Sequence, residues 1–157
     1  MDKLKKLLAD AGRVLAHEGQ GDYVAGHISL RLPDDPGLFL MKPAGIGLEE
    51  MTADNIITVN IEGDKVGGQA PRHNEVFIHS EVLRARPDVQ AVVHTHAIHA
   101  FVLSSPGKPL LPVSNAAAFF AAWLPVFSET TELIITSARG RAVARTLGDR
   151  GAMILRN

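Results

Sequence analysis

The chain has 157 residues, of which 46% are hydrophobic and 21% are charged, and its formal net charge is -1. These values are typical of a single folded domain and argue against a basic surface that binds nucleic acid. The absence of cysteine excludes disulfides, thiolate metal sites and cysteine nucleophiles. The longest apolar run, Ala116–Leu124, ends at Pro125 and is far shorter than the ~20 residues that span a bilayer. We therefore expect a cytoplasmic protein with neither a membrane nor a nucleic-acid partner.

The first third of the chain predicts one helix followed by hairpin-linked strands. Apolar residues recur at helical spacing before Gly19, which ends the helix. Strands are expected at residues 27–32, 38–41 and 56–61. The short turns between them, such as the sequence PDDPG, favour antiparallel hairpins over parallel crossovers.

The remainder of the chain predicts alternating helices and strands. A helix at about residues 75–84 precedes a strand at 89–96, and residues 111–127 are ambiguous. A short strand is expected at 132–136, after which Ser137 caps a helix that ends at Leu147 before Gly148, and a last strand covers 152–155. One mixed α/β domain is the simplest interpretation.

The histidines of the sequence VQAVVHTH are the strongest candidates for metal ligands. His94 and His96 stand two residues apart on a predicted strand, so their side chains leave the same face. Two imidazoles on one face can share a metal, and histidine suits Zn, Mn, Co or Fe better than Ca or Mg. Two partly buried structural histidines would show the same spacing, so the pair alone leaves both alternatives open.

Other titratable residues lie near this pair in the sequence. Glu75 begins the predicted helix, where it could either serve the site or only complement the helix dipole. His79 lies one turn later on the same face, and it could orient the site or be a hydrogen-bonded core histidine. His99 could lie at the rim of the same pocket, whereas His17 ends the first helix and complements its dipole.

Four sequence blocks occur in a characteristic order. They are GHISLR at 26–31, KPAGIG at 42–47, NEVFIH at 74–79 and RPDVQAVVHTH at 86–96. In this order they resemble the class II aldolase/adducin superfamily, and the last two blocks are the specific ones. The resemblance covers roughly residues 5 to 157 and implies a three-layer α/β/α domain with a largely antiparallel central sheet.

The resemblance also implies roles for individual residues. His94 and His96 match paired ligands of a divalent metal, with Zn expected first and Mn, Co or Fe as alternatives. Glu75 matches the catalytic acid/base, and the loops at His27 and Gly45 match segments that hold the far end of the substrate. The implied activity is that of a metal-dependent lyase, a decarboxylase or aldolase that stabilises an enediolate-type intermediate. The implied assembly is a homotetramer with sites between subunits.

One departure from the family pattern concerns the metal site. The third metal histidine of the family would directly follow Asn157, so the single domain at 1–157 is expected to lack its C-terminal part. His99, His73 or His27 could replace that ligand, and no spacing rule selects one of them.

A second departure concerns the substrate. Phosphate-binding members carry an asparagine and a serine pair where this chain has His27 and His73-Asn74, with Arg72 alongside. These side chains crowd a phosphate cradle, whereas the fork of Arg72 fits a carboxylate, so all four are candidate substrate-binding residues. We expect a small carboxylate substrate, as in the aromatic hydroxy-acid decarboxylases. A solvated loop arginine, a sugar-phosphate aldolase or epimerase, and a non-catalytic adducin-like binding module are the alternatives.

Overall fold

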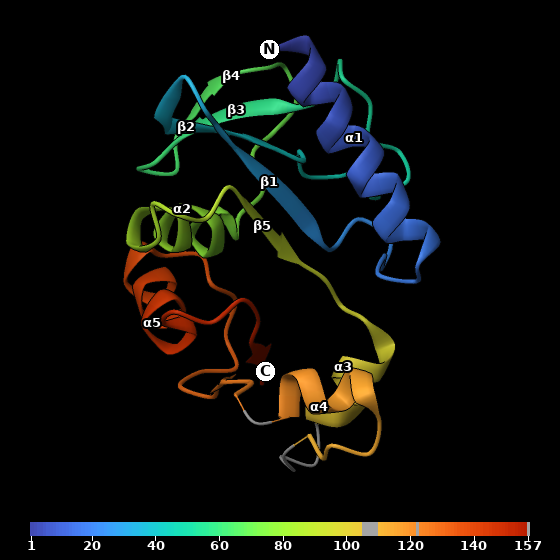
Figure 1. Cartoon of the computed structure of the whole chain (residues 1–157). Helices are drawn as coiled ribbons and strands as arrows, with labels where there is room; N and C mark the ends of the chain where they lie inside the picture. Colours follow the sequence, from blue (N-terminus) through green and yellow to red (C-terminus); the bar gives the residue numbers. More distant parts are fainter. Residues whose placement is uncertain (105–109, 122, 157) are drawn as a thin grey trace.

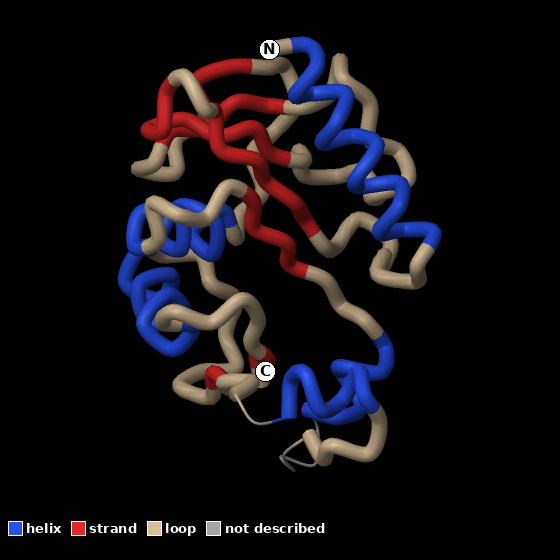
Figure 2. Tube along the Cα trace, in the orientation of Figure 1, coloured by secondary structure: helices blue, strands red, loops and turns tan. Residues whose placement is uncertain are grey.

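A five-stranded antiparallel sheet forms the centre of the computed structural model, which describes residues 1–104, 110–121 and 123–156 (Figures 1 and 2). Its strand order is β4-β3-β2-β1-β5. The strands are β1 (His27–Leu32), β2 (Asp35–Met41), β3 (Ile57–Asn60), β4 (Lys65–Gly67) and β5 (Ala91–His94). The predicted hairpins and the largely antiparallel sheet are therefore confirmed.

Five helices and a small second sheet complete the described fold (Figure 1). The helices are α1 (Asp2–His17), α2 (Val76–Ala85), α3 (Ile98–Ser104), α4 (Asn115–Ala121) and α5 (Ser137–Leu147). The short strands β6 (Val126–Phe127) and β7 (Ile154–Leu155) pair in parallel. None of the described helices is long and apolar enough to cross a membrane.

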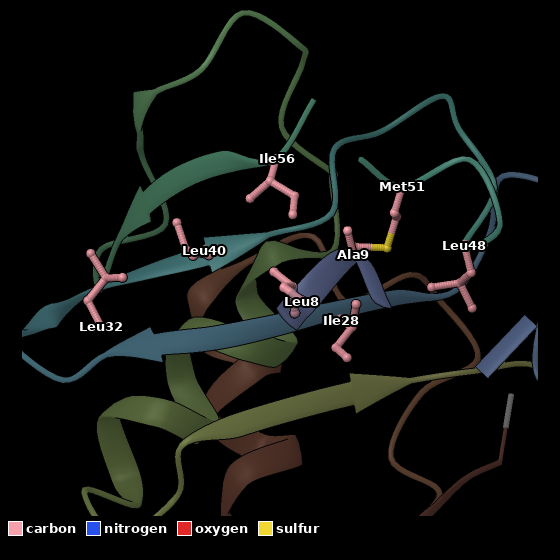
Figure 3. Packing of buried hydrophobic residues seen from close by; sticks show 8 residues of the cluster. All are labelled: Leu8, Ala9, Ile28, Leu32, Leu40, Leu48, Met51 and Ile56. Atoms are coloured by element: carbon pink, nitrogen blue, oxygen red, sulfur yellow. The ribbon is translucent and has the colours of Figure 1, made fainter. Parts of the chain in front are cut away.

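Helices cover both faces of the central sheet. On one face, Leu8 and Ala9 of α1 pack in a cluster with Ile28 and Leu40 (Figure 3). On the other face, a second cluster joins Val76 of α2 to buried side chains of β2 and β3. Helix α5 then packs on α2 so closely that a Cβ at Gly140 would lie 2.4 Å from the carbonyl oxygen of Phe77. The expected α/β/α layering is confirmed, with α5 outside α2.

The polar residues of β1 are buried because α2 covers them. Ile28 and Leu32 face α1, whereas His27, Ser29 and Arg31 alternate with them and are also buried. The Arg31 guanidinium donates to the carbonyl oxygens of Pro36, Leu83, Arg86 and Val89. The arginine of the GHISLR block therefore ties β1 to the end of α2.

Three local predictions differ from the structure. Residues 132–136 form no ladder within the described chain, because the Ile134 N–H donates to the Glu75 carboxylate instead. The N-cap of α5 is Thr136, one residue before Ser137, and it accepts a hydrogen bond from the Arg139 N–H. The strand predicted at 89–96 ends at His94, so His96 lies beyond it. Residue 122 of the ambiguous segment lies outside the described residues.

Candidate active site

Three histidines lie together where strands β1 and β5 meet the loop before α2. His27 and His94 are directly opposite in the ladder, and their rings stack with centroids 4.7 Å apart. The His73 ring lies 4.2 Å from that of His27 on another side. A histidine cluster therefore forms where the central strands end.

His94 and His96 approach each other through their outer nitrogens. The two Nε2 atoms are 3.1 Å apart and the rings are perpendicular. Two nitrogens bound to one tetrahedral zinc at about 2.0–2.1 Å stand about 3.3 Å apart, so this spacing fits a shared ion. Burial lowers the pKa of His94 to about 4, against the opposing effect of Glu75 and with smaller contributions from His96 and His73. The neutral ring is the form that binds a metal.

The loop before β1 holds the segment His94-Thr95-His96, called the HTH segment below, in place. The Asp22 carboxylate lies 3.0 Å from His96 Nδ1, which leaves Nε2 of that ring for an ion. Thr95 Oγ1 donates to Gln20 Oε1 in the same loop, and Lys42 Nζ donates to the Val24 carbonyl. Burial lowers the pKa of Lys42 to about 8. Sequence reasoning did not find Asp22, and no motif in the chain marks it.

Glu75 is the N-cap residue of α2, yet its side chain makes no capping bond. Its Oε1 atom accepts a hydrogen bond from the Ile134 N–H at 3.1 Å, and its Oε2 atom lies 3.8 Å from His27 Nε2. The backbone N–H donates to His73 Nδ1 at 3.3 Å. The side chain is therefore directed by tertiary contacts into the histidine cluster and is largely buried.

Glu75 also belongs to a second group of possible metal donors. One ligand atom each of His27, His73 and Glu75 lies within 4.8 Å of the others. Two histidines and a carboxylate suit zinc as well as the HTH pair does. Of the three histidines considered as substitutes for a third ligand, the structure brings His27 and His73 to the site, whereas His99 is exposed on α3.

A cavity of about 770 Å³ opens beside these groups. One part of its wall is polar, with Asp22, Glu75, His94 and His96. Another part is apolar and is built from α3, β7 and the segments next to them, including Phe101, Leu133, Met153 and Leu155. A cavity with a few converging polar groups on an otherwise apolar wall is the usual form of a small-molecule site.

None of the five predicted substrate residues lines this cavity, although His27 and His73 lie beside Glu75. Gly45 is exposed in a turn with φ of 84°, and its loop is tied to the next one by the bond from Ala44 N–H to the Pro71 carbonyl. The Arg72 guanidinium donates to the His73 carbonyl and lies over the Phe77 ring. Asn74 is exposed. A substrate contact of Gly45, Arg72 or Asn74 stays a prediction.

His79 is a buried, hydrogen-bonded histidine, as one of the two sequence alternatives proposed. Its Nε2 atom lies 2.5 Å from His27 Nδ1, and its Nδ1 atom lies 2.7 Å from Ser29 Oγ. Burial holds the pKa of both His27 and His79 well below the usual value, and their imidazole neighbours lower it further. Sequence analysis gave no sign that these three residues are connected.

The sequence motifs and the antiparallel fold are both shared with known proteins. The Class II Aldolase and Adducin N-terminal domain matches residues 6–157. The chain belongs to this family. The matched region covers nearly the whole chain and therefore contains every residue of the candidate site.

Individual members of the family cover more than one chemistry. A 3,4-dihydroxyphthalate decarboxylase from Arthrobacter keyseri is 32% identical, over 97% of this chain and 65% of the relative. An L-fuculose 1-phosphate aldolase from Glaciozyma antarctica PI12 superposes with a TM-score of 0.86 at 32% identity, over 99% of this chain and 61% of that one. An aldolase II superfamily protein from Pseudomonas syringae superposes with a TM-score of 0.87 at 31% identity, over 96% and 61%. The chain spans less than two thirds of each.

Proposed function

We propose that this protein is a metal-dependent carbon–carbon lyase whose reacting groups are Glu75, His94 and His96. The observation that carries the proposal is the common cavity wall of these three residues, with the two Nε2 atoms 3.1 Å apart. The resemblance of the sequence blocks to the class II aldolase/adducin superfamily implies a role for the same three residues. Membership in the class II aldolase family supports the same class of reaction.

The residues divide the chemistry between them. His94 and His96 would hold a divalent ion, expected to be Zn, which acts as a Lewis acid on substrate oxygens when bound. Glu75 moves the proton at Oε2, because Oε1 is occupied by the Ile134 N–H. The apolar wall around Phe101 offers a surface for the apolar part of a substrate beside the reacting groups.

We propose further that the substrate is a hydroxylated or oxo carboxylic acid without phosphate, and that the reaction is a decarboxylation or an aldol cleavage. By the family resemblance, His27 and His73 stand where phosphate-binding members carry smaller hydrogen-bonding groups, and their larger rings leave less room for a phosphate. The decarboxylase from Arthrobacter keyseri acts on an acid and is 32% identical. The equal identity to an L-fuculose 1-phosphate aldolase keeps sugar-phosphate cleavage as the second candidate.

A substrate panel on the full chain loaded with Zn or Mn tests both candidates. The panel contains dihydroxylated aromatic acids, aliphatic hydroxy acids, ketose 1-phosphates and pentulose 5-phosphates. We expect turnover of an acid, followed as released CO2 or as the cleaved carbonyl product. Turnover of a sugar phosphate alone would establish the second candidate. A chain that binds no metal and turns over nothing would instead be an adducin-like binding module.

We propose that the assembled protein is a homotetramer. Large apolar side chains are exposed on α3 and around α4, among them Ile98, Phe101, Val113 and Phe119. Apolar patches of this kind mark association surfaces in stable oligomers. Light scattering coupled to size exclusion tests the proposal, and a monomer at micromolar concentration would contradict it.

A further inference from the structure

Three buried side chains form a continuous hydrogen-bonded chain behind the candidate site. Ser29 Oγ contacts His79 Nδ1 at 2.7 Å, and His79 Nε2 contacts His27 Nδ1 at 2.5 Å. All three residues have a relative exposure of 0%. The outer end of the chain is His27 Nε2, which is buried, has no hydrogen-bond partner among the described residues and lies 3.8 Å from Glu75 Oε2.

A neutral imidazole has one N–H and one lone pair, so the chain has only two consistent orders of donors. In the first, the Ser29 hydroxyl donates to His79, His79 Nε2–H donates to His27, and His27 carries its proton on Nε2. In the second, every bond is reversed: His27 donates to His79, His79 donates to Ser29, and His27 Nε2 keeps a lone pair. The heavy-atom distances fit both orders.

The two ends of the chain favour the first order. The second order leaves the Ser29 hydroxyl hydrogen without an acceptor, because His79 Nδ1 is the one side-chain partner of Ser29 Oγ in the described structure. It also points the lone pair of His27 Nε2 at the Glu75 carboxylate, so that two acceptors face each other. A buried unsatisfied donor costs about 1–3 kcal/mol, and the first order avoids that cost at Ser29. It also replaces the repulsion between two acceptors by an N–H of His27 that faces the Glu75 carboxylate 3.8 Å away.

We infer that Ser29 and His79 fix His27 as a hydrogen-bond donor, with its N–H at Nε2 directed to the site. His27 Nε2 and Glu75 Oε2 are 3.8 Å apart, too close for an oxygen to lie between them, so a substrate oxygen that contacts both atoms would lie to one side of the line that joins them. Such an oxygen accepts from His27 while its own proton is held by Glu75. His27 is then a substrate-contacting donor, and Ser29 and His79 are positioning residues. The contact of His27 with a substrate rests on the proposed lyase function. The order of hydrogen-bond donors from Ser29 through His79 to His27 does not depend on that function.

The tautomer of His27 decides between the two groups of possible metal ligands, which are His27 with His73 and Glu75, and His94 with His96. A His27 ring protonated on Nε2 has no lone pair there for a metal, and its Nδ1 is taken by His79. The group of His27, His73 and Glu75 therefore loses one of its members as a ligand. In the described part of the chain the Nε2 atoms of His94 and His96 have only each other as partners, at 3.1 Å, so an ion that replaces this contact belongs with His94 and His96.

Nitrogen-15 NMR of the full chain, labelled at histidine and kept free of metal, tests the order of donors. The chemical shifts of the two ring nitrogens distinguish the Nε2–H from the Nδ1–H tautomer, and magic-angle-spinning spectra give them for an assembly of any size. We expect His27 in the Nε2–H form, assigned by its loss in a His27→Asn variant. A neutral His27 in the Nδ1–H form, or a doubly protonated ring at pH 7.5, would overturn the inference.

Variants at Ser29 test the control that this residue exerts from the far end of the chain. Ser29→Ala removes the first donor, so we expect His27 to change from one tautomer to a mixture, and Ser29→Thr to retain the wild-type form. A single Nε2–H form in both variants would overturn the role of Ser29. If Ser29→Ala does not fold, Ser29→Thr and the wild-type spectrum still decide the order. Correct tautomers in a protein that cleaves no substrate would count against the lyase proposal and not against this inference.

Discussion

The contact between Asp22 and His96 fixes the ring orientation of one proposed metal ligand. Because Asp22 Oδ2 lies 3.0 Å from Nδ1, the imidazole is held as the tautomer with a lone pair on Nε2. We expect Asp22→Asn to weaken zinc binding by ~10–100-fold, the usual effect of losing such a carboxylate. Competition with a chromogenic chelator measures the affinity. Asp34→Asn, at an exposed turn, is the matched control, and equal affinities in the two variants would rule out this role of Asp22.

Glu75 is expected to act on the reaction without holding the ion. A Glu75→Gln side chain can still accept the Ile134 N–H through its amide oxygen, so the fold should persist. The variant cannot take up a proton at neutral pH, and turnover should fall by ~100-fold or more. Metal content, measured by elemental analysis, should stay at the wild-type level. Glu18→Gln at the end of α1 is the control, and wild-type turnover in Glu75→Gln would exclude Glu75 from the mechanism.

Sequence reasoning finds residues whose partners are close in the chain. His94, His96 and Glu75 were identified from local spacing and motif, and the structure places them on one cavity. Asp22 and Ile134 were missed because each meets its partner only after folding, across 74 and 59 positions of the chain respectively. Their side-chain or backbone chemistry is ordinary, so no local pattern marks them.

At the scale of elements, the packing of α5 on α2 limits what can stand at Gly140. Alanine normally favours a helix over glycine by about 1 kcal/mol. Here the added Cβ would lie 2.4 Å from the Phe77 carbonyl oxygen, and a backbone atom cannot move aside as a side chain can. We expect Gly140→Ala to lower the free energy of unfolding by ~1–3 kcal/mol, the usual cost of overpacking.

Gly12→Ala in α1 is the matched control for this prediction. Its added Cβ would meet chiefly the sulfur of Met51, the flexible end of a side chain, so the cost should be smaller. Urea unfolding of both variants measures the difference. Equal or greater stability of Gly140→Ala relative to wild type would show that α5 is free to move away from α2, which carries Glu75 at its N-cap.

The elements themselves were predictable where one periodicity dominates. Helix α1 and strand β3 follow from apolar spacing because each buries one regular face, whereas α2 and β1 are buried on more than one side. The extended segment at 132–136 shows the same apolar character, with Ile134 buried between exposed Leu133 and Ile135. It still forms no ladder within the described chain, because the Ile134 N–H donates its hydrogen bond to the Glu75 side chain. Periodicity predicts burial, and it does not identify the hydrogen-bond partner.

At the scale of the molecule, the sheet and its helical layers followed from the hairpin turns and the family resemblance. The location of α3 was not predictable in the same way, because it buries none of its side chains in the described structure. Its apolar residues Phe101 and Val102 remain exposed, so their pattern carries no information about a packing partner within the chain. An element whose partner is a substrate or another subunit cannot be placed from the sequence of one chain.

The buried histidines make the whole fold sensitive to acid. Burial holds the pKa of His79 well below its usual value of about 6.5, and the neighbouring His27, His94 and His73 lower it further. Below pH 6.5 His79 is therefore protonated in the unfolded chain but stays neutral in the folded chain. Stability is fully present above pH 6.5 and falls as the pH decreases, by up to about 1.4 kcal/mol per pH unit for each such histidine.

Urea unfolding in the presence of a chelator, at pH 6.5 and pH 5.0, isolates the contribution of His79. Between these values the wild-type chain should lose about 1.6 kcal/mol more stability than a His79→Gln variant, which has no proton to take up at this position. His17→Gln, at the exposed end of α1, should lose as much as the wild type. Parallel losses in the wild type and His79→Gln would mean that His79 takes up its proton within the fold, and the buried chain from Ser29 to His27 would then have to open on the way to pH 5.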